Sequence, residues 1–200
     1  CGHPPGLHRA SEQQHQQIMT GNHPVSEAEA DLSQLEVLIT REQLQERIQE
    51  LGREITKDYT KKELHLVGVL KGSFVFLADL VRELRLSCRM HFLQASSYKD
   101  RKTSSGYVTI THSLDLTGKH ILVVEDIFDT GLTLLRVVED LQSQDPASLE
   151  VCTLLDKKIP GKAPVRVKYR GFEIENRFVV GYGLDYGERY REIPEIVCLD

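Results

Sequence analysis

Residues 121–134 have the sequence ILVVEDIFDTGLTL, in which an apolar run ends in acidic residues and a short turn. The four residues of positions 121–124 are typical of a buried parallel strand. Three carboxylates, Glu125, Asp126 and Asp129, follow, and apolar residues then recur at helical spacing from Leu134 onward. Because ligands of parallel α/β sheets bind at the carboxyl ends of the strands, this stretch predicts a ligand site.

The acidic residues and the turn suit different parts of one ligand. Backbone N–H groups, threonine hydroxyls and a helix N-terminus make Asp129 to Thr133 suitable for a phosphate. Glu125 and Asp126 repel phosphate, but they can accept hydrogen bonds from hydroxyl groups or hold a divalent cation. A sugar phosphate carries both kinds of group. The structural alternative is that Asp126 or Asp129 only caps the helix, which leaves the other carboxylates unexplained.

The flanking sequence predicts alternating strands and helices. Thr40 and Gln43 form a capping box for an amphipathic helix from residue 41 to about 58. Strands are expected at 64–70, 88–96, 108–111, 121–124 and 149–155, helices near 74–84 and 134–141, and a mobile polar loop at 99–106. This order implies right-handed crossovers. We therefore expect an α/β fold with a twisted, mainly parallel sheet flanked by helices.

Composition excludes several classes of protein. The 200 residues include 25 Lys+Arg and 30 Asp+Glu, and the net charge of −5 argues against a generally basic nucleic-acid binder. No apolar run approaches the roughly 18 residues that span a bilayer, and no signal peptide is recognisable. The four cysteines lack a CxxC pair and are expected to be buried free thiols. We expect a cytoplasmic protein with no nucleic-acid and no membrane partner.

Residues 1–35 differ in composition from the rest of the chain. They are rich in proline, glutamine and histidine and contain few large apolar residues. Such a segment cannot bury enough surface to offset the entropy of ordering it. We expect a disordered tail over residues 1–35 and one domain over residues 36–200. The irregular spacing of the four histidines argues against a metal site in the tail.

Residues 123–134 closely resemble the phosphoribosyl pyrophosphate signature of the type I phosphoribosyltransferases. Three more segments are similar to those of the hypoxanthine (6-oxopurine) phosphoribosyltransferases. Residues 69–73 resemble the pyrophosphate loop, residues 96–98 open a segment like the mobile catalytic loop, and residues 177–186 resemble the purine-binding segment. The resemblance runs from about residue 37 to the end. It implies the type I phosphoribosyltransferase fold, with a small hood formed by N- and C-terminal segments.

The resemblance implies Mg²⁺-dependent transfer of ribose 5-phosphate from phosphoribosyl pyrophosphate to N9 of hypoxanthine or guanine. IMP or GMP and pyrophosphate are the products, and an oxocarbenium-like transition state would need charge stabilisation at the leaving group. Asp129 would be the general acid/base at the purine N7. Lys71 and Gly72 would contact pyrophosphate at a peptide that is often cis. The residues implied to bind phosphoribosyl pyrophosphate are Lys71, Gly72, Ser97, Tyr98, Glu125, Asp126, Asp129, Thr130, Gly131, Leu132, Thr133 and Arg191.

The resemblance also assigns the base and the metal. The residues implied to bind the purine are Lys157, Phe178, Val179 and Asp185. Lys157 would donate to O6, which favours a 6-oxopurine over adenine, because a 6-amino group is not an acceptor there. Phe178 would stack on the base. Oxygen ligands suit Mg²⁺, and those implied to hold it are Asp185, Glu125 and Asp126.

Two alternatives stay open. One is a non-enzymatic regulator on the same fold that binds nucleotides and RNA, although the acidic balance gives no sign of a basic RNA-binding face. The other is a phosphoribosyltransferase for xanthine or a pyrimidine. Lys157 and Phe178 favour 6-oxopurines but do not separate hypoxanthine, guanine and xanthine. The resemblance further implies a homodimer or homotetramer with Lys71 near the subunit interface. The sequence departs from the family pattern at Ser73, where many relatives have glycine.

Overall fold

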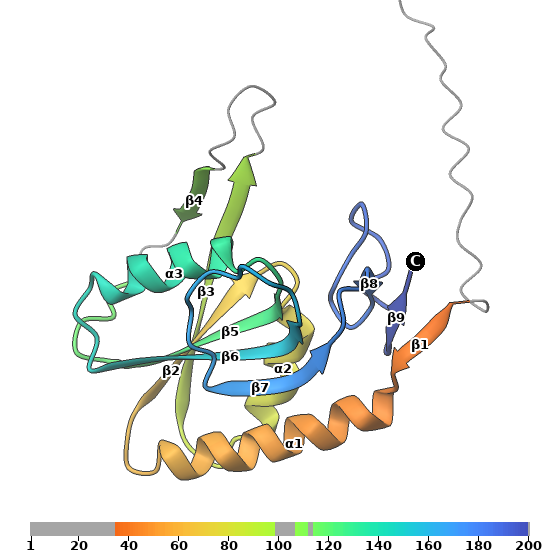
Figure 1. Cartoon of the computed structure of the whole chain (residues 1–200). Coiled ribbons are helices and arrows are strands. Elements are labelled where there is room, and N and C mark those ends of the chain that lie inside the picture. Colours follow the sequence, from red (N-terminus) through yellow and green to blue (C-terminus); the bar gives the residue numbers. More distant parts are fainter. Residues whose placement is uncertain (1–34, 99–106, 112–113, 200) are drawn as a thin grey trace, which may run out of the picture. The chain divides into compact units, whose positions relative to one another are not determined.

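A computed structural model describes residues 35–98, 107–111 and 114–199 of the chain (Figure 1). The predicted tail over residues 1–35, apart from Leu35, and the predicted mobile loop at 99–106 lie outside these ranges. Everything below concerns the unit that begins at Leu35.

The main sheet has six strands in the order β4-β3-β2-β5-β6-β7. Five strands are parallel, and β4 pairs antiparallel with β3 at one edge, which confirms the predicted mainly parallel sheet. The strands are β2 (Leu64–Leu70), β3 (Cys88–Tyr98), β4 (Tyr107–Thr111), β5 (His120–Phe128), β6 (Ser148–Lys157) and β7 (Tyr169–Ile174).

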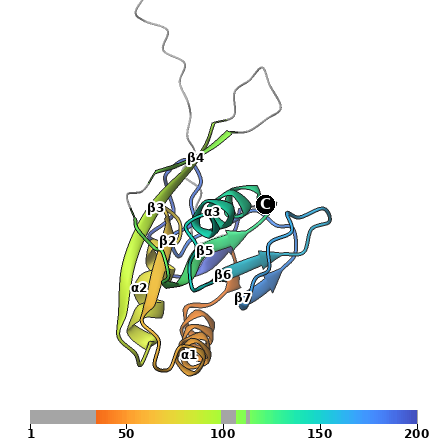
Figure 2. The ribbon, with the colours of Figure 1, turned by 90° about the vertical axis from the view of Figure 1, so that its left-hand side faces the viewer.

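Helices cover both faces of this sheet. The helices α1 (Arg41–Asp58) and α2 (Phe74–Glu83) pack on one face, and α3 (Leu132–Gln142) packs on the other (Figures 1 and 2). Alternate residues of β5 serve the two cores: Leu122 faces the α1 and α2 side, whereas Val123 faces α3. Full burial of each such side chain contributes about 1.5–3 kcal/mol. The predicted capping box is present, with Thr40 Oγ1 accepting from the Gln43 N–H.

A second, three-stranded antiparallel sheet forms the expected hood. It joins β1 (Glu36–Ile39), β9 (Ile196–Cys198) and β8 (Val179–Val180), with β9 in the middle. Glu36 and Val179 both lie opposite Cys198, one on each side. N- and C-terminal segments therefore build the hood together, as the resemblance implies.

The strand β5 is longer than the predicted 121–124. Its pairing with β6 continues through Glu125 and Ile127 to Phe128, and only Asp126 has no partner residue in this register. The two acidic residues end the apolar run in the sequence, but Ile127 and Phe128 resume it, so the ladder persists. Glu125 and Asp126 consequently lie within the last residues of β5 rather than beyond the strand.

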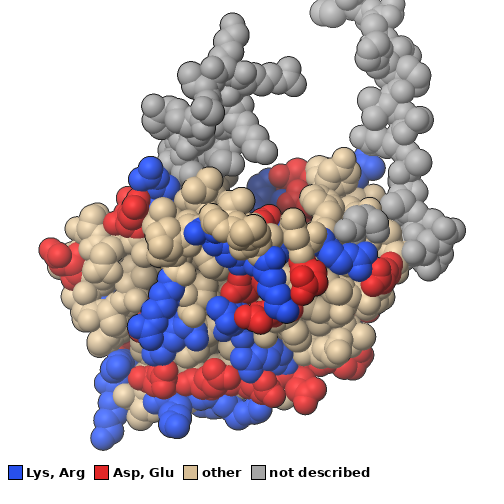
Figure 3. All heavy atoms as spheres, in the orientation of Figure 1, with Lys and Arg blue, Asp and Glu red and all other residues tan. Residues whose placement is uncertain are grey.

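Charge and hydropathy of the surface agree with the composition. On the face drawn in Figure 3, basic and acidic side chains are mixed, above all over α1. Within the described part of the chain, no helix combines the length and the apolar character needed for a membrane span. Cys152 is a buried free thiol, as expected, whereas the free thiol of Cys88 is only partly buried.

Candidate active site

The predicted site residues gather where β2, β5 and β6 end (Figure 1). Lys71 and Gly72 follow β2, Glu125 and Asp126 lie in β5, and Lys157 is the last residue of β6. Since β5 lies between β2 and β6 in the sheet, the sequence order of these motifs becomes spatial proximity.

Gly72 is held against the acidic pair. A Cβ atom at Gly72 would overlap the carboxylate of Asp126, and one at Gly183 would overlap the carbonyl oxygen of Gly72. The Leu70–Lys71 peptide is cis, as the resemblance suggested. Only glycine fits at position 72, so the loop after β2 lies between Asp126 and the segment around Gly183.

Ser73, the departure from the family pattern, is accommodated by a local hydrogen bond. Its side chain is buried, and its hydroxyl donates to the carbonyl of Val69 at 2.6 Å. The polar atom is therefore satisfied without reaching the site.

Glu125 and Asp126 form a close acidic pair with too few donors. Burial, reinforced by the neighbouring charge of Asp126, raises the pKa of Glu125 well above its usual value. Burial also raises the pKa of Asp126, although hydrogen bonds, among them the Ile127 N–H at 2.9 Å, and the charge of Arg191 act against it. The buried Glu125 Oε2 has no hydrogen-bond partner among the described residues. An unmet buried acceptor costs about 1–3 kcal/mol, so a ligand that brings hydroxyl donors or a cation is favoured here.

The turn after β5 leaves a helix N-terminus open. Gly131, with φ of +79°, is the N-cap of α3, and no side chain caps the helix. The alternative that Asp126 or Asp129 caps it is therefore wrong. Asp129 is half-exposed, and its Oδ2 lies 3.2 Å from Lys157 Nζ. Uncapped N–H groups and the helix dipole make the turn from Asp129 to Thr133 suitable for an anion.

Arg191 joins the C-terminal segment to the loop after β2. Its guanidinium donates to the carbonyl of Gly183 at 2.8 Å and lies 2.9 Å from an Asp185 carboxylate oxygen. Glu188 bridges Arg191 and Lys71, because its Oε2 lies 3.2 Å from the Arg191 guanidinium and 2.9 Å from Lys71 Nζ. Glu188 was not predicted from the sequence, where only its spacing of three from both Asp185 and Arg191 hinted at a contact.

The predicted base-binding residues Phe178 and Val179 differ in their exposure to solvent. Phe178 is 46% exposed and meets Tyr186 edge to face, with ring centroids 5.5 Å apart, so it is not simply a core residue. Val179 is buried in β8. Ser97 and Tyr98 end β3 opposite Val108 and Tyr107, while their side chains lie outside the described part of the structure.

The donor set fits magnesium only in combination with substrate oxygens. Among residues 35–98, 107–111 and 114–199, no group of three or more His, Cys, Asp or Glu side chains is arranged to hold a metal ion. Glu125 and Asp126 supply adjacent carboxylates, and the oxygens of Asp185 already accept from Arg191 and from the Glu188 N–H. Mg²⁺ commonly takes one or two carboxylates and completes its shell with phosphate oxygens and water, which this set permits.

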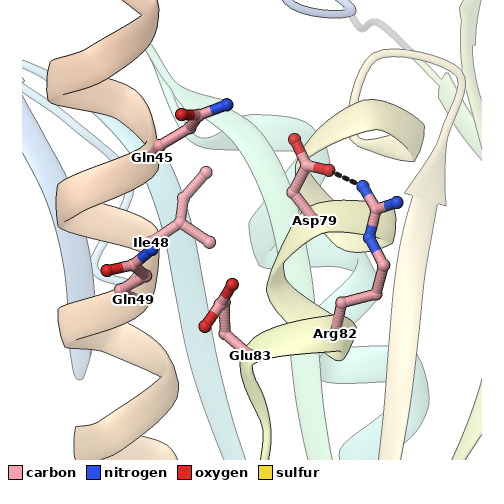
Figure 4. Close-up of a pocket in the computed structure, with 6 residues that line it drawn as sticks. All are labelled: Gln45, Ile48, Gln49, Asp79, Arg82 and Glu83. Carbon is pink, nitrogen blue, oxygen red and sulfur yellow. Dashed lines mark hydrogen bonds and ion pairs between the residues drawn. The ribbon is translucent and has the colours of Figure 1, made fainter.

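A separate cavity lies between α1 and α2. It has a volume of about 360 Å³ and contains none of the predicted site residues (Figure 4). Its lining is mostly polar and includes the Asp79–Arg82 ion pair. Tyr182 also donates to Asp79, which ties α2 to the segment before Gly183.

Comparisons with known proteins agree with this geometry. Residues 33–187 match the phosphoribosyl transferase domain family. A hypoxanthine phosphoribosyltransferase of Haemophilus influenzae is 46% identical over 81% of this chain and 93% of its own length. A hypoxanthine-guanine phosphoribosyltransferase of Dictyostelium discoideum is 47% identical over 80% of this chain and 92% of its own. The crystal structure of a hypoxanthine phosphoribosyltransferase from Staphylococcus aureus is similar with a TM-score of 0.78 and 44% identity, covering 82% of this chain and 91% of that one.

Proposed function

The chain belongs to the phosphoribosyl transferase domain family, and from this premise we propose that it is a hypoxanthine phosphoribosyltransferase of purine salvage. It transfers ribose 5-phosphate from phosphoribosyl pyrophosphate to N9 of hypoxanthine, and of guanine, and releases pyrophosphate. The observation that carries the proposal is the contact of Gly72 with Asp126, which joins the pyrophosphate loop to the acidic pair of the signature. The relatives named for hypoxanthine and for hypoxanthine-guanine support the choice of base.

The residues around β5 bind the sugar phosphate. Glu125 and Asp126 accept hydrogen bonds from the ribose hydroxyls, which meets the unsatisfied oxygen of Glu125. The backbone of Asp129 to Thr133, including Thr130, Gly131 and Leu132, surrounds the 5′-phosphate. Holding the ribose in place before attack supplies part of the rate enhancement.

Asp129 and Lys157 act on the base. Lys157 donates to O6 of the purine and, 3.2 Å from Asp129, keeps that carboxylate oriented toward N7, where Asp129 accepts and returns a proton. Phe178 stacks on the purine, the backbone of Val179 reads its edge, and Asp185 lies beside it.

Cationic groups stabilise the leaving pyrophosphate. Lys71 and Gly72 bind it from the loop after β2, and Arg191 binds it from the C-terminal segment. Asp185, Glu125 and Asp126 would hold Mg²⁺, which would supply charge neutralisation for the phosphate oxygens. Ser97 and Tyr98 cover the reacting centre and exclude water.

The direct test is product formation. The protein is mixed with Mg²⁺, phosphoribosyl pyrophosphate and, in turn, hypoxanthine, guanine, xanthine, adenine and uracil, and nucleotide formation is followed. We expect turnover with hypoxanthine and guanine and none with adenine or uracil. Turnover with xanthine alone would favour the xanthine enzyme, and no product with any base would favour the nucleotide-binding regulator.

We further infer self-association, which exposed apolar side chains on α2 and β3 support. Phe74 at the start of α2 is 45% exposed, and Met90 and Phe92 on β3 are 50% and 47% exposed. Exposed apolar side chains of this kind are compatible with a protein–protein contact. Together with the family resemblance, they support the proposal of a homodimer or homotetramer with Lys71 near the interface. Light scattering should give a multiple of the 22.8 kDa chain mass, and a monomer at micromolar concentration would contradict it.

Location and domain limits are part of the same proposal. The free thiols of Cys88 and Cys152 suit a reducing compartment, so we place the enzyme in the cytoplasm. Residues 36–200 are the catalytic domain, and deletion of residues 1–35 should leave turnover within about twofold of the full chain. A collapse of activity on deletion would contradict this division.

A further inference from the structure

The turn of residues 129–133 is built against the ring of Phe128, the last residue of β5. Phe128 is 5% exposed, and a Cβ atom at Gly131 would overlap its ring. Gly131 also has a positive φ of +79°, which few other residues adopt. The path of the turn therefore depends on where the Phe128 ring lies.

The connection between β6 and β7 contacts both the ring and the turn. Lys162 Nζ lies 4.3 Å from the centroid of the Phe128 ring, a cation–π distance. The neighbouring Ala163 N–H donates to the carbonyl of Thr130 at 2.9 Å. Two consecutive residues of this connection thus contact the beginning of the turn, Lys162 at the ring of Phe128 just before it and Ala163 at Thr130 within it.

Lys162 is itself fixed by a second contact. Its ammonium forms an ion pair with Asp156, which also accepts from Arg170. The side chains of Lys162 and Asp156 are only 16% and 10% exposed. Because the ammonium is largely removed from water, its attraction to the carboxylate and to the ring is strengthened. Next to Asp156, Lys157 holds Asp129, so the end of β6 supports the turn from two sides.

Resting on the proposed function, we propose that Lys162 is a positioning residue for the 5′-phosphate subsite. It holds the ring of Phe128, and through that ring the backbone of residues 129–133. Asp156 and the ring engage the ammonium, so Lys162 acts on the turn and not on the phosphate. The base subsite around Phe178 does not depend on it.

The test compares Michaelis constants for the two substrates. Lys162→Met keeps the apolar stem and removes the charge, and Lys162→Arg keeps a cation that can pair and stack. Lys158→Met is the matched control, since the Lys158 side chain is exposed and, among the described residues, its ammonium pairs with Glu175 alone. We expect Lys162→Met to raise KM for phosphoribosyl pyrophosphate about tenfold, with KM for hypoxanthine within about twofold. Lys162→Arg should restore most of the loss. An equal rise of both KM values, a fall of kcat alone, or no change would overturn the proposal.

A double variant separates positioning from direct phosphate binding. Phe128→Leu removes the ring and should reproduce the selective rise in KM, and the double variant Phe128→Leu, Lys162→Met should be no worse than the stronger single change. If the two effects multiply, Lys162 acts independently of the ring and the proposal fails. Should Lys162→Met not fold, Phe128→Leu carries the test: a KM that rises equally for both substrates overturns it.

A binding measurement keeps this proposal distinguishable from the proposed function. Calorimetry with ribose 5-phosphate, without any base, reports the phosphate subsite whether or not the protein turns over. Weaker binding to Lys162→Met than to Lys158→Met supports the positioning role even if no nucleotide forms with any base. Equal binding to both variants overturns it even if the wild type is an active enzyme.

Discussion

The carboxyl ends of β5 and β6 lie side by side, with Phe128 opposite Asp156. The carboxylates at these two ends nevertheless have opposite surroundings. Asp156 on β6 is paired with two cations, Lys162 and Arg170. Glu125 on β5 has a buried oxygen without a partner in the described chain, and its nearest charged neighbour is another acid.

This difference distinguishes a carboxylate that stabilises the site from one that is available to a ligand. A buried carboxylate with cationic partners stabilises the arrangement around it, and removing one partner is costly. A buried carboxylate without a cationic partner has a raised pKa, and a ligand that supplies cations or donors can relieve this cost. By this criterion, Asp156 on β6 supports the site, and in the proposed function Glu125 on β5 meets the sugar. Each of the following variants tests one side of that contrast.

Asp129→Asn should have the largest effect. The amide keeps the shape of the side chain at the end of β5 but cannot exchange a proton with the purine. We expect kcat to fall by roughly 10²–10⁴-fold, with binding of phosphoribosyl pyrophosphate largely kept. Steady-state kinetics and calorimetry measure the two quantities. Unchanged turnover would remove Asp129 from the acid/base role.

Lys157→Ala should come next. The variant removes the donor to O6 and frees the Asp129 carboxylate, now 3.2 Å from the ammonium. A hydrogen bond from a charged donor contributes about 1.5–3 kcal/mol, so kcat/KM for hypoxanthine should fall by about 10–100-fold. Binding of phosphoribosyl pyrophosphate should change much less. An equal loss for both substrates would contradict the assignment of Lys157 to the base.

Asp156→Ala should act on stability. It leaves Lys162 and Arg170 without their shared carboxylate, and because Arg170 is 42% exposed, water relieves part of the loss. We expect the free energy of unfolding to fall by about 1–3 kcal/mol, measured by urea denaturation. A variant as stable as wild type would show that the paired end of β6 does not support the site.

Glu125→Gln should change stability in the opposite direction and by less. A neutral amide cannot ionise, so it avoids the unfavourable burial that raises the pKa of Glu125, and the free protein should become more stable while activity falls. A gain of about 1 kcal/mol would raise Tm by roughly 2–4 °C in a domain of this size. Calorimetry without magnesium or substrate measures it, with Glu46→Gln on the exposed side of α1 as the control. A lower Tm for Glu125→Gln would contradict a carboxylate whose burial is unfavourable in the free protein.

The same carboxylate predicts a pH dependence. Since burial raises the pKa of Glu125 above its ordinary value of 4.5, the folded protein binds more protons than the unfolded chain above that pH. Its contribution to stability is present below pH 4.5 and is lost as pH rises through the raised pKa. The stability difference between Glu125→Gln and wild type should therefore widen with rising pH. A constant difference would mean that Glu125 does not titrate differently on folding.

Much of this contrast could be foreseen from the sequence, but not all of it. Apolar runs and the signature placed Glu125 and Asp129 at a strand end, because local patterns carry that information. The contact of Lys162 with Phe128 could not be predicted from local patterns, because Lys162 lies in a loop that has no periodicity. The same holds for Glu188, whose contact with Lys71 spans 117 positions.

The strand pairing of the hood could not be predicted from local sequence patterns either. Its strands β1 and β9 pair Glu36 with Cys198, and such pairs leave no short-range signal in the chain. Only the resemblance to the family predicted that the two ends meet. Long-range pairing of short strands depends on the finished sheet, whereas α1 is specified by its own capping box and apolar stripe.

Proton release on substrate binding tests the contrast most directly. Hydroxyl donors and cationic charge that reach Glu125 favour its ionised form, so binding of Mg²⁺ and phosphoribosyl pyrophosphate should expel the proton held by the raised pKa. Calorimetry in buffers of different ionisation enthalpy counts that proton. We predict a release from the wild-type protein that exceeds that from Glu125→Gln by up to about one proton. Equal proton counts for the two proteins would contradict the account.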